Sequence, residues 1–511
     1  MKGSGGGMKR GIETGIEAVA RGIRQSLYSL AWHLLTPLLF AYLLWRSRRQ
    51  PAYRAHWRER WGLIARRRRR GKPLIWIHAV SVGETRAAEP LIRALQQRYP
   101  HAEWLLTCTT PTGREAGRGL FGDSVRQAYF PYDYPWAMRR FLKAWRPSLG
   151  IVMETELWPN LTRQAQRLRV PLAAVNVRLS ERSLQKAERY GALIRDALAR
   201  LDTVAAQTNE DAARLGRLGR RQVAVTGNLK FDVTPGEAMR AKGLAWRQAL
   251  AGRPVVLAAS TRDGEEALLL AAWKRCIDGA PRRPLLLLVP RHPQRFDEVE
   301  ALCRHGGWQV VRRSASGSDG AVSDGSDAGD GARAAGPGDA GASGIGLGET
   351  GLGGTGSSGI RSGASDAWAR ADIVLGDSMG EMFAYYAAAD VAIIGGSLLK
   401  FGAQNLIEAS ALGVPVVLGP HTFNFKEAAQ QAIACGAALS VTDADEAVAR
   451  ALGLVADADA WQASHAAALQ FAGTHRGATQ RTIEALEPLL VRCRLRLEAP
   501  SETSQPRAAG A

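Results

Sequence analysis

The feature that most constrains this chain is a repeated alternation of short apolar runs with helical stretches, which begins at residue 72. Each run is rich in strand-forming residues and is followed by a small or polar turn. Strands that are apolar throughout must be covered on both faces, which is typical of a parallel sheet flanked by helices. The first series of runs comprises residues 74–80, 104–108, 125–130, 149–153, 171–177, 203–207 and 222–227.

The same alternation starts again after residues 235–252. The second series comprises residues 255–259, 285–290, 308–312, 372–376, 390–394 and 414–418. The chain of 511 residues is long enough for two such domains. We therefore predict an α/β protein with two Rossmann-like domains facing a central cleft, because ligands bind at the carboxyl ends of doubly wound strands.

These patterns also predict the domain limits. We expect a basic N-terminus with an anchor helix in residues 1–50, a first domain in 51–235, a second domain in 236–498 with a closing helix at 478–497, and a disordered tail at 499–511. Residues 314–366 interrupt the second domain with a run of Gly, Ser, Ala and Asp. This run has too little apolar surface to offset its ordering entropy, so we predict a disordered insertion.

Residues 26–45 contain no formal charge and are long enough, as a helix, to span a hydrocarbon layer of roughly 30 Å. Residues 1–25 carry five basic and two acidic groups, whereas residues 46–70 carry eleven and one. Positive charge stays on the cytoplasmic side, so we predict a membrane-anchor helix with the bulk of the chain in the cytoplasm. His33 and Pro37 weaken this prediction; a cleaved signal peptide and a helix buried in the protein are the alternatives.

Charge and motifs limit the function classes. Of the net charge of +19, residues 1–70 supply +13, a pattern shared by nucleic-acid binders and by proteins that rest on an anionic membrane. The five cysteines are scattered without a CxxC pair, which argues against a disulfide framework and a structural zinc site. The sequence contains no HExxH, no P-loop motif and no full GxGxxG after the first strand, so zinc hydrolysis, P-loop chemistry and nicotinamide chemistry are disfavoured.

In the first domain, candidate residues follow three predicted strands. Glu84 lies in the turn after residues 74–80, where it can accept a proton from a hydroxyl nucleophile; the alternative is that it only complements a helix dipole. Glu154 follows residues 149–153 with a second carboxylate, and can hold an acceptor or mark a helix start. Arg178 and Arg182 can bind acceptor phosphates or belong to a solvated helix start.

In the second domain, four turns after strands hold Ser260; Arg291 and His292; Met379, Gly380 and Glu381; and Asn405 and Glu408. A permanently charged arginine such as Arg291 suits a phosphate or carboxylate. Asn405 and Glu408 are three residues apart, so they share a helix face and can hydrogen-bond a ribose or phosphate, with ordinary capping as the alternative. We expect these turns to bind a nucleotide.

Eight segments carry a resemblance to a known family: HAVSVGE, METELWPN, NVRLSERS, VTGNLKFD, STRDGEE, VPRHPQR, DSMGEM and GAQNLIEASALGVPVVLGPHTFNF. In this order and spacing the chain resembles the Kdo (3-deoxy-D-manno-oct-2-ulosonic acid) transferases of Gram-negative lipopolysaccharide synthesis. The resemblance covers roughly residues 25–495, except the insertion at 314–366. Residues 402–405 read GAQN and residues 408–410 read EAS, where the family often has GGQN and EPA.

The resemblance implies a GT-B glycosyltransferase at the inner membrane, with CMP-Kdo as donor, the lipid A precursor lipid IVA as acceptor and inversion at the anomeric carbon. No metal is required if basic groups and helix dipoles stabilise the leaving charge, so we expect no metal and no cofactor. Glu84 matches the catalytic base and Glu154 an acceptor-side carboxylate. The positions that match those binding CMP and the sugar carboxylate are Arg291, Met379, Gly380, Asn405 and Glu408.

Three other functions fit parts of the sequence. Another GT-B enzyme would use a UDP-sugar and a different lipid, and a sugar-nucleotide epimerase would share the architecture without needing an anchor. A membrane-tethered nucleic-acid binder would explain the basic N-terminus and would bind DNA or RNA in a strongly salt-dependent manner. It would leave the polar turns unexplained, so we expect no nucleic-acid partner.

Overall fold

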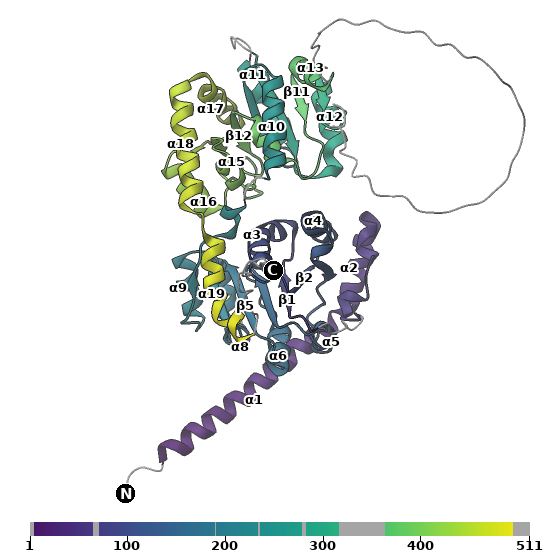
Figure 1. The fold of residues 1–511 in the computed structure, drawn as a ribbon, viewed down its shortest axis with the longest axis vertical. Coiled ribbons are helices and arrows are strands. Elements are labelled where there is room, and N and C mark those ends of the chain that lie inside the picture. Colours follow the sequence, from purple (N-terminus) through teal and green to yellow (C-terminus); the bar gives the residue numbers. More distant parts are fainter. Residues whose placement is uncertain are drawn as a thin grey trace, which may run out of the picture. The chain divides into compact units, whose positions relative to one another are not determined.

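The computed structural model describes residues 5–64, 71–189, 191–233, 236–277, 283–315 and 363–493. It divides into two compact units, Met1–Thr234 with Ala472–Ala511, and Pro235–Phe471. Each is built on a parallel sheet with seven described strands, which confirms the two predicted α/β sheets (Figure 1). Most of the predicted insertion at 314–366, the arginine run at 66–70 and the tail at 499–511 lie outside the described residues.

The first sheet has the strand order β3-β2-β1-β4-β5-β6-β7. Its strands are β1 (Leu74–His78), β2 (Glu103–Cys108), β3 (Arg126–Tyr129), β4 (Leu149–Met153), β5 (Leu172–Val177), β6 (Thr203–Ala206) and β7 (Ala224–Val225). Each predicted run of the first series therefore forms a strand. β1 lies in the middle, paired in parallel with β2 on one side and β4 on the other.

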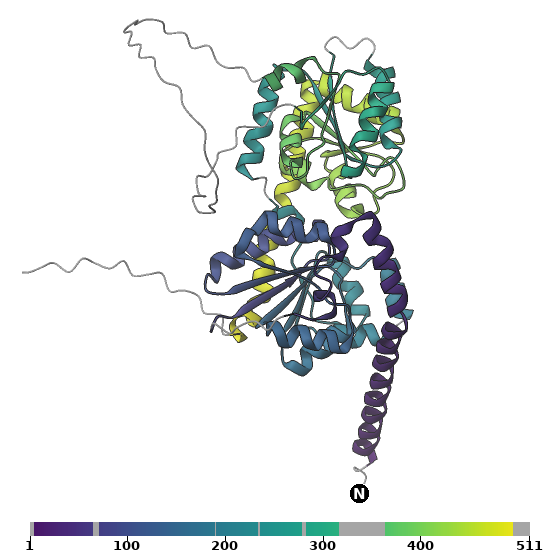
Figure 2. The ribbon, with the colours of Figure 1, turned by 90° about the vertical axis from the view of Figure 1, so that its right-hand side faces the viewer.

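Helices cover both faces of this sheet (Figure 2). They are α3 (Val82–Arg98), α4 (Pro111–Phe121), α5 (Pro135–Trp145), α6 (Pro159–Leu168), α7 (Glu181–Arg189), α8 (Gly191–Ala199), α9 (Asn209–Arg217) and α19 (Ala478–Arg492). Successive side chains of a strand point to opposite faces. Ile75 and Ile77 therefore join a core with α3 and α19, whereas Leu74 and Trp76 join one with α5 and α6.

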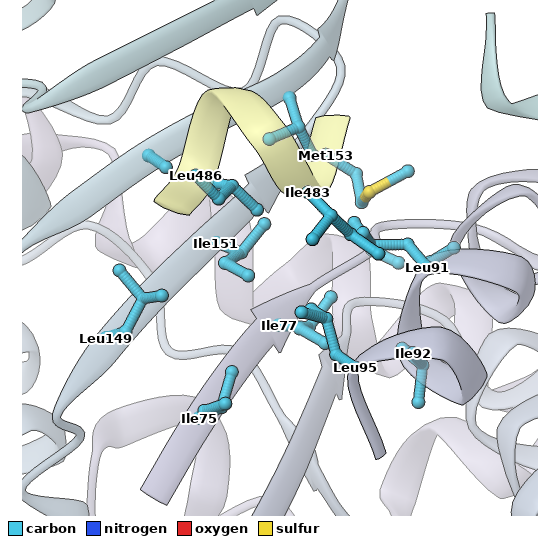
Figure 3. Close-up of a cluster of buried hydrophobic side chains, with 14 of the residues drawn as sticks. Ile75, Ile77, Leu91, Ile92, Leu95, Leu149, Ile151, Met153, Ile483 and Leu486 are labelled. Atoms are coloured by element: carbon cyan, nitrogen blue, oxygen red, sulfur yellow. The ribbon is translucent and has the colours of Figure 1, made fainter. Parts of the chain in front are cut away.

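The position of α19 differs from our expectation. The sequence pattern assigned a closing helix at 478–497 to the second domain, but α19 packs on the first sheet. Ile483 and Leu486 contact the same core as Ile151 of β4 and Leu91 of α3 (Figure 3). Asp232 helps to fix this return, because its carboxylate accepts hydrogen bonds from backbone N–H groups at the start of α19.

The second sheet has the order β10-β11-β9-β8-β12-β13-β14. Its strands are β8 (Val255–Thr261), β9 (Leu285–Pro290), β10 (Val310–Arg312), β11 (Ile373–Leu375), β12 (Val391–Ile394), β13 (Val416–Leu418) and β14 (Ala438–Ser440). All neighbouring strands are parallel. The sequence predicted each strand except the three-residue edge strand β14.

The helices of the second unit are α10 (Glu237–Ala249), α11 (Glu265–Ile277), α12 (Phe296–His305), α13 (Gly363–Arg370), α14 (Met382–Ala388), α15 (Ile407–Ala411), α16 (Lys426–Ala434), α17 (Ala444–Ala456) and α18 (Ala458–Thr474), which ends in the first unit. α13 begins inside the span predicted to be disordered. Short 3₁₀ helices across the chain are η1 (Pro51–Arg54), η2 (Glu59–Trp61), η3 (Gly122–Ser124), η4 (Leu229–Asp232) and η5 (Pro293–Arg295). α11 and α17 pack on one face of the sheet.

The single helix predicted over residues 26–45 is wrong. The segment forms α1 (Gly5–Leu34) and α2 (Thr36–Arg49), which are bent by 44° at the break. Pro37 explains the break, because it lacks an N–H and its ring clashes with the carbonyl four residues earlier. Among the described residues, no single helix has the length and apolar character to cross a membrane, although this bent pair has both when taken together.

The C-terminal half of α1 docks on the first unit through polar and aromatic side chains. Gln25 donates to Asn160 Oδ1 (2.8 Å), and the Tyr28 hydroxyl donates to Asp133 (3.0 Å). Trp32 packs edge-on against Tyr134 with ring centroids 5.5 Å apart. Both views show that the N-terminal half of α1 extends away from these contacts (Figures 1 and 2).

We expect Leu486→Ala to destabilise the first unit. Leu486 lies on the face of α19 that packs on the sheet and is fully buried. Truncating such a side chain costs about 2–5 kcal/mol in the free energy of unfolding. Val491 on the same helix is 65% exposed, so the control Val491→Ala should change the free energy of unfolding by less than about 0.5 kcal/mol. Urea denaturation followed by tryptophan fluorescence measures both. Equal losses would contradict the packing of α19.

Candidate active site

In each unit, two of the polar turns predicted from the sequence lie where the strand order reverses. In the first sheet the order reverses between β1 and β4, and in the second between β8 and β12. Loops diverge at such a switch point and leave a ligand-binding crevice beside the carboxyl ends of the strands. Glu84 follows β1 and Glu154 follows β4, whereas Ser260 ends β8 and the turn before Asn405 follows β12.

Glu84 lies in the first turn of α3. The Ser81 hydroxyl caps this helix by accepting from the Glu84 N–H, and the Glu84 carboxylate accepts from the Val80 N–H at 2.8 Å. This reciprocal pair is similar to a capping box, except that the carboxylate binds the N–H of the residue before the N-cap, so Glu84 also serves the start of the helix. Glu84 is nonetheless only 9% exposed, and its carboxylate also accepts from the Ser81 hydroxyl at 3.2 Å.

Three carboxylates influence one another at this point. Burial, then the nearby Glu154, raise the pKa of Glu84 to about 7, with Glu156 adding to the effect against the hydrogen bond from Val80. Burial, with a smaller contribution from Glu154, likewise raises the pKa of Glu156. A carboxyl group with a pKa near neutrality can take up or release a proton at physiological pH, as a general base must.

Glu154 is held in an unusual backbone conformation. Its φ is +56°, in the left-handed region that a residue with a side chain seldom adopts, and Asn176, near the carboxyl end of the next strand β5, has the same φ. Lys230 forms an ion pair with the Glu154 carboxylate at 3.1 Å. Strained residues of this kind cluster at functional sites, where the surrounding structure holds them in place.

Of the two predicted arginines, the structure brings one to this group. The Arg178 carbonyl accepts a hydrogen bond from the Thr155 hydroxyl, so Arg178 lies next to the Glu154–Glu156 turn. Arg182 is exposed in the first turn of α7, and no described contact joins it to the carboxylates. The prediction that arginines bind acceptor phosphates therefore rests mainly on Arg178.

In the second unit, β8 and β12 approach each other closely. Ser260 has a φ of +57° at an irregularity between β8 and β9. A Cβ on Gly395 would lie 2.4 Å from the Ser260 carbonyl oxygen, so only glycine fits there. The close approach brings the end of β8 against the loop that leads to Asn405.

Cationic groups gather after β8 and β9. Arg262 donates to His292 Nε2 at 2.6 Å and lies over the Phe401 ring at 4.7 Å. Burial, then Arg262, Arg291 and Arg295, lower the pKa of His292. Because His292 accepts a hydrogen bond and its protonation is disfavoured, it is neutral beside the arginines, and these suit the phosphate of a nucleotide.

The turn after β11 exposes one predicted residue and anchors another. Met379 is 62% exposed, and Gly380 has a φ of +86°. The Glu381 carboxylate is bound by Lys242 at 2.7 Å and Arg313 at 3.3 Å. Burial raises the pKa of Glu381, but these cations and Ser378 outweigh it and the pKa is lowered. Glu381 is thus placed to hold the turn, whereas Met379 and Gly380 are accessible.

Asn405 and Glu408 meet as the spacing predicted, although Asn405 precedes α15 rather than lying on it. The Asn405 side chain donates to Glu408 Oε1 at 3.1 Å and accepts from the Ile407 N–H at 3.1 Å. Capping and pairing therefore occur together. The asparagine oxygen satisfies the N–H of Ile407, the first residue of α15, although Asn405 lies one residue before the N-cap Leu406.

The sequence analysis missed several residues that hold the site. Lys230, Lys242 and Arg313 bind predicted carboxylates from distant parts of the chain, so no local pattern marks them. Glu265 was quoted within STRDGEE without a role, yet it is fully buried and binds backbone N–H groups after β12. An ionisable residue at the start of an apolar helix was the available signal.

Comparison with known proteins identifies the family. The family model "3-Deoxy-D-manno-octulosonic-acid transferase (kdotransferase)" matches residues 55–233. A 3-deoxy-D-manno-octulosonic acid transferase from Bordetella pertussis is 44% identical over 482 residues, covering 91% of this chain and 99% of the relative. The Haemophilus influenzae protein of the same name is 33% identical over 463 residues, covering 89% and 96%.

Solved structures show the fold. A glycosyltransferase from Rickettsia africae has a TM-score of 0.50 at 13% identity and covers 82% of this chain and 98% of its own. A UDP-GlcNAc 2-epimerase from Neisseria meningitidis has a TM-score of 0.50 at 13% identity, covering 81% and 100%. Both likenesses fit the arrangement of two Rossmann-like domains found in GT-B proteins.

The raised pKa of Glu84 predicts a pH-dependent stability. An unfolded glutamate loses its proton near its ordinary pKa of 4.5, but folded Glu84 does so near 7. Within this window the folded state binds more protons, so the contribution of Glu84 to the free energy of unfolding falls as the pH rises and levels off above 7.

Glu84→Gln removes this titration, so the stability of the variant relative to the parent should rise by on the order of 2 kcal/mol between pH 4.5 and pH 8. Denaturation curves at both pH values measure the difference. The exposed Glu115 on α4 gives a control, Glu115→Gln, which should show no such trend. A constant difference between Glu84→Gln and the parent would contradict the raised pKa.

Proposed function

Because the chain belongs to the family of 3-deoxy-D-manno-octulosonic acid (Kdo) transferases, we propose that it transfers Kdo from CMP-Kdo to a hydroxyl of the lipid A precursor lipid IVA, with inversion at the anomeric carbon. The observation that carries the proposal is the buried Glu84 carboxyl, with a pKa of about 7, at the switch point of the first sheet. It has the burial and proton affinity of a general base.

The acceptor belongs to the first unit in this proposal. The acceptor is a lipid disaccharide bisphosphate, so its recognition needs groups for sugar hydroxyls and for phosphate. Glu154, fixed by Lys230 at 3.1 Å, offers a carboxylate to hydroxyls beside Glu84. Arg178 lies next to the same turn, and its guanidinium suits a phosphate.

The donor belongs to the second unit. Arg291 follows β9 beside Arg262 and the neutral His292, and these positive charges suit the CMP phosphate. Asn405 and Glu408 form a hydrogen-bonded pair with polar atoms for a ribose or the Kdo carboxylate region. Met379 and Gly380 follow β11 in the same unit, and the exposed Met379 is suited to contact the base.

The reaction follows from these roles. Glu84 takes the proton of the acceptor hydroxyl, whose oxygen attacks the anomeric carbon of Kdo as the bond to the CMP phosphate breaks. The electron pair of that bond leaves on the phosphate, where arginines stabilise the negative charge. Attack on the face opposite CMP inverts the configuration. The products are the glycosylated lipid, CMP and a proton on Glu84.

We place the enzyme at the inner membrane with both units in the cytoplasm. Support comes from the exposed apolar side chains of α1 and α2, which include Leu34 at 70% and Leu38 at 67% exposure. The positive charge after residue 45 favours the cytoplasmic side. Because Tyr28 and Gln25 bind the protein body, α1 is suited to lie in the membrane interface with only one face in lipid.

Product mass tests the donor and the acceptor together. Purified protein in detergent is incubated with lipid IVA and either CMP-Kdo or a panel of UDP-sugars. We expect the mass of lipid IVA to rise by whole Kdo units with CMP-Kdo alone. Transfer from a UDP-sugar instead would favour the alternative glycosyltransferase, and conversion of a UDP-sugar without a lipid acceptor would favour an epimerase.

Glu84→Ala should lower kcat by about 10²–10⁴, because no other group would take the hydroxyl proton. Binding of CMP, measured by calorimetry, should stay within twofold of the parent, since the donor residues lie in the other unit. Glu89→Ala, which removes a partly exposed carboxylate from the same helix, is the control and should retain activity. Substantial turnover by Glu84→Ala would refute the assignment of the base.

A further inference from the structure

A hollow lies in the first unit, apart from the residues of the candidate active site. It has a volume of about 310 Å³ and lies between α1, α6 and α8. Arg200, on its wall, comes just before the amino end of β6, whereas Glu84 follows the carboxyl end of β1. At Arg200 the hollow therefore lies toward the opposite end of the sheet from Glu84.

Arginines dominate the hollow. Arg21 of α1, Arg163 of α6 and Arg200 all line it. The described residues provide no hydrogen bond or ion pair to the Arg163 side chain, and Nη1 of Arg200 is buried without a partner among them. The single carboxylate on the wall, Asp196, lies 3.7 Å from Arg24 and is thus already shared. The walls carry an excess of positive charge.

The arginines also repel one another. Burial, then Arg167, lower the pKa of Arg163. Burial lowers the pKa of Arg200 as well; Arg163 and Arg21 add to this effect, and Asp196 opposes it. Guanidinium groups remain charged at neutral pH, so the repulsion persists until an anion neutralises it. A phosphate matches these forked donors in geometry as well as in charge.

One buried oxygen on the wall of the hollow lacks a hydrogen-bond donor. Gln25 lines the hollow and is 2% exposed; its Nε2 binds Asn160, but its Oε1 has no partner among the described residues. A buried acceptor without a hydrogen bond costs about 1–3 kcal/mol. A ligand with a hydroxyl or amine beside its phosphate would satisfy it, whereas a bare phosphate dianion would not.

An apolar stripe runs along α1 next to the hollow. Its members are Val19 (64% exposed), Ile23 (55%), Leu27 (60%), Leu30 (53%) and Leu34 (70%). At about 100° per residue, this stripe is opposite Gln25, Tyr28 and Trp32, which dock on the unit. Gly22 lies between the hollow and the stripe, and a Cβ added there would meet no atom within 4 Å. At Gly22, no side chain separates the charged hollow from the apolar face.

We propose that this hollow binds the phosphate head group of an anionic membrane phospholipid, whose acyl chains lie along the apolar stripe of α1. The arginines bind the phosphate, and a head-group hydroxyl donates to Gln25 Oε1. The stripe identifies a lipid rather than free phosphate as the source of the anion. The inference rests on the proposed membrane location but does not depend on which sugar is transferred.

Phosphatidylglycerol is the probe, added to the full-length protein in a neutral detergent and detected as a bound lipid by native mass spectrometry. We expect one tightly held lipid. The double variant Arg163→Gln/Arg200→Gln should bind it at least about 10-fold more weakly, because two charge-assisted contacts are lost. The matched control Arg139→Gln/Arg140→Gln removes the same charge from exposed positions on α5 and should bind within twofold of the parent.

A charge-neutral variant separates a defined hollow from diffuse attraction. Gly22→Leu adds a side chain where the backbone has space, at a helical position, so the fold should be retained. It should weaken phosphatidylglycerol binding several-fold by narrowing the route between hollow and stripe. Unchanged binding by Gly22→Leu, or equal losses in both arginine double variants, would overturn the proposal.

Two further measurements identify the ligand. Phosphatidylcholine should bind more weakly than phosphatidylglycerol. Inorganic phosphate should not displace the bound lipid. Displacement at matching concentrations would assign the hollow to free phosphate and overturn the lipid assignment. Kdo transfer in detergent should be unchanged in all the hollow variants. Loss of lipid binding with normal transfer supports the inference, while failure of transfer in the parent concerns only the proposed reaction.

Discussion

A buried carboxylate organises the switch point of the second unit. Glu265, at the first position of α11, is fully buried and accepts hydrogen bonds from the backbone N–H groups of Arg262, Gly396, Leu398 and Leu399. Hydrogen bonds to charged groups are worth about 1.5–3 kcal/mol each, and an unpaired buried carboxylate is strongly unfavourable. The turn after β8 and the loop after β12 are therefore held as one piece, and the donor residues in both depend on it.

The first unit uses the same device at another place. Asp133 is fully buried and accepts from the backbone N–H groups of Asn160 and Leu161 and from the Tyr28 hydroxyl. Burial outweighs these bonds and raises the pKa of Asp133 to about 7. One carboxylate thus joins the start of α6 to α1. The helix that carries the apolar stripe is connected to the sheet by a polar contact, which fixes which side of α1 is left exposed.

The sequence predicted local features well and long-range ones poorly. Apolar runs marked nearly every strand, and the spacing of Asn405 and Glu408 anticipated their hydrogen bond, because both signals lie within a few residues. The assignment of the last helix failed, since the apolar face of α19 fits either sheet equally well by composition. The sequence could not predict the ion-pair partners of Glu381, because Lys242 and Arg313 are near it only in the folded chain. At residues 26–45, the uncharged run was given more weight than Pro37, and the proline decided the shape.

The return of α19 has a consequence for synthesis of the protein on the ribosome. The face of the first sheet that includes Ile77 and Ile151 is completed by Ile483 and Leu486, which follow the entire second unit in the chain. At 5–20 residues per second, translation of that unit takes roughly 10 to 50 seconds. During this time the nascent first unit has part of its apolar core uncovered, which makes it a natural client for chaperones. The second unit is continuous in the chain, so it completes its core as soon as it emerges.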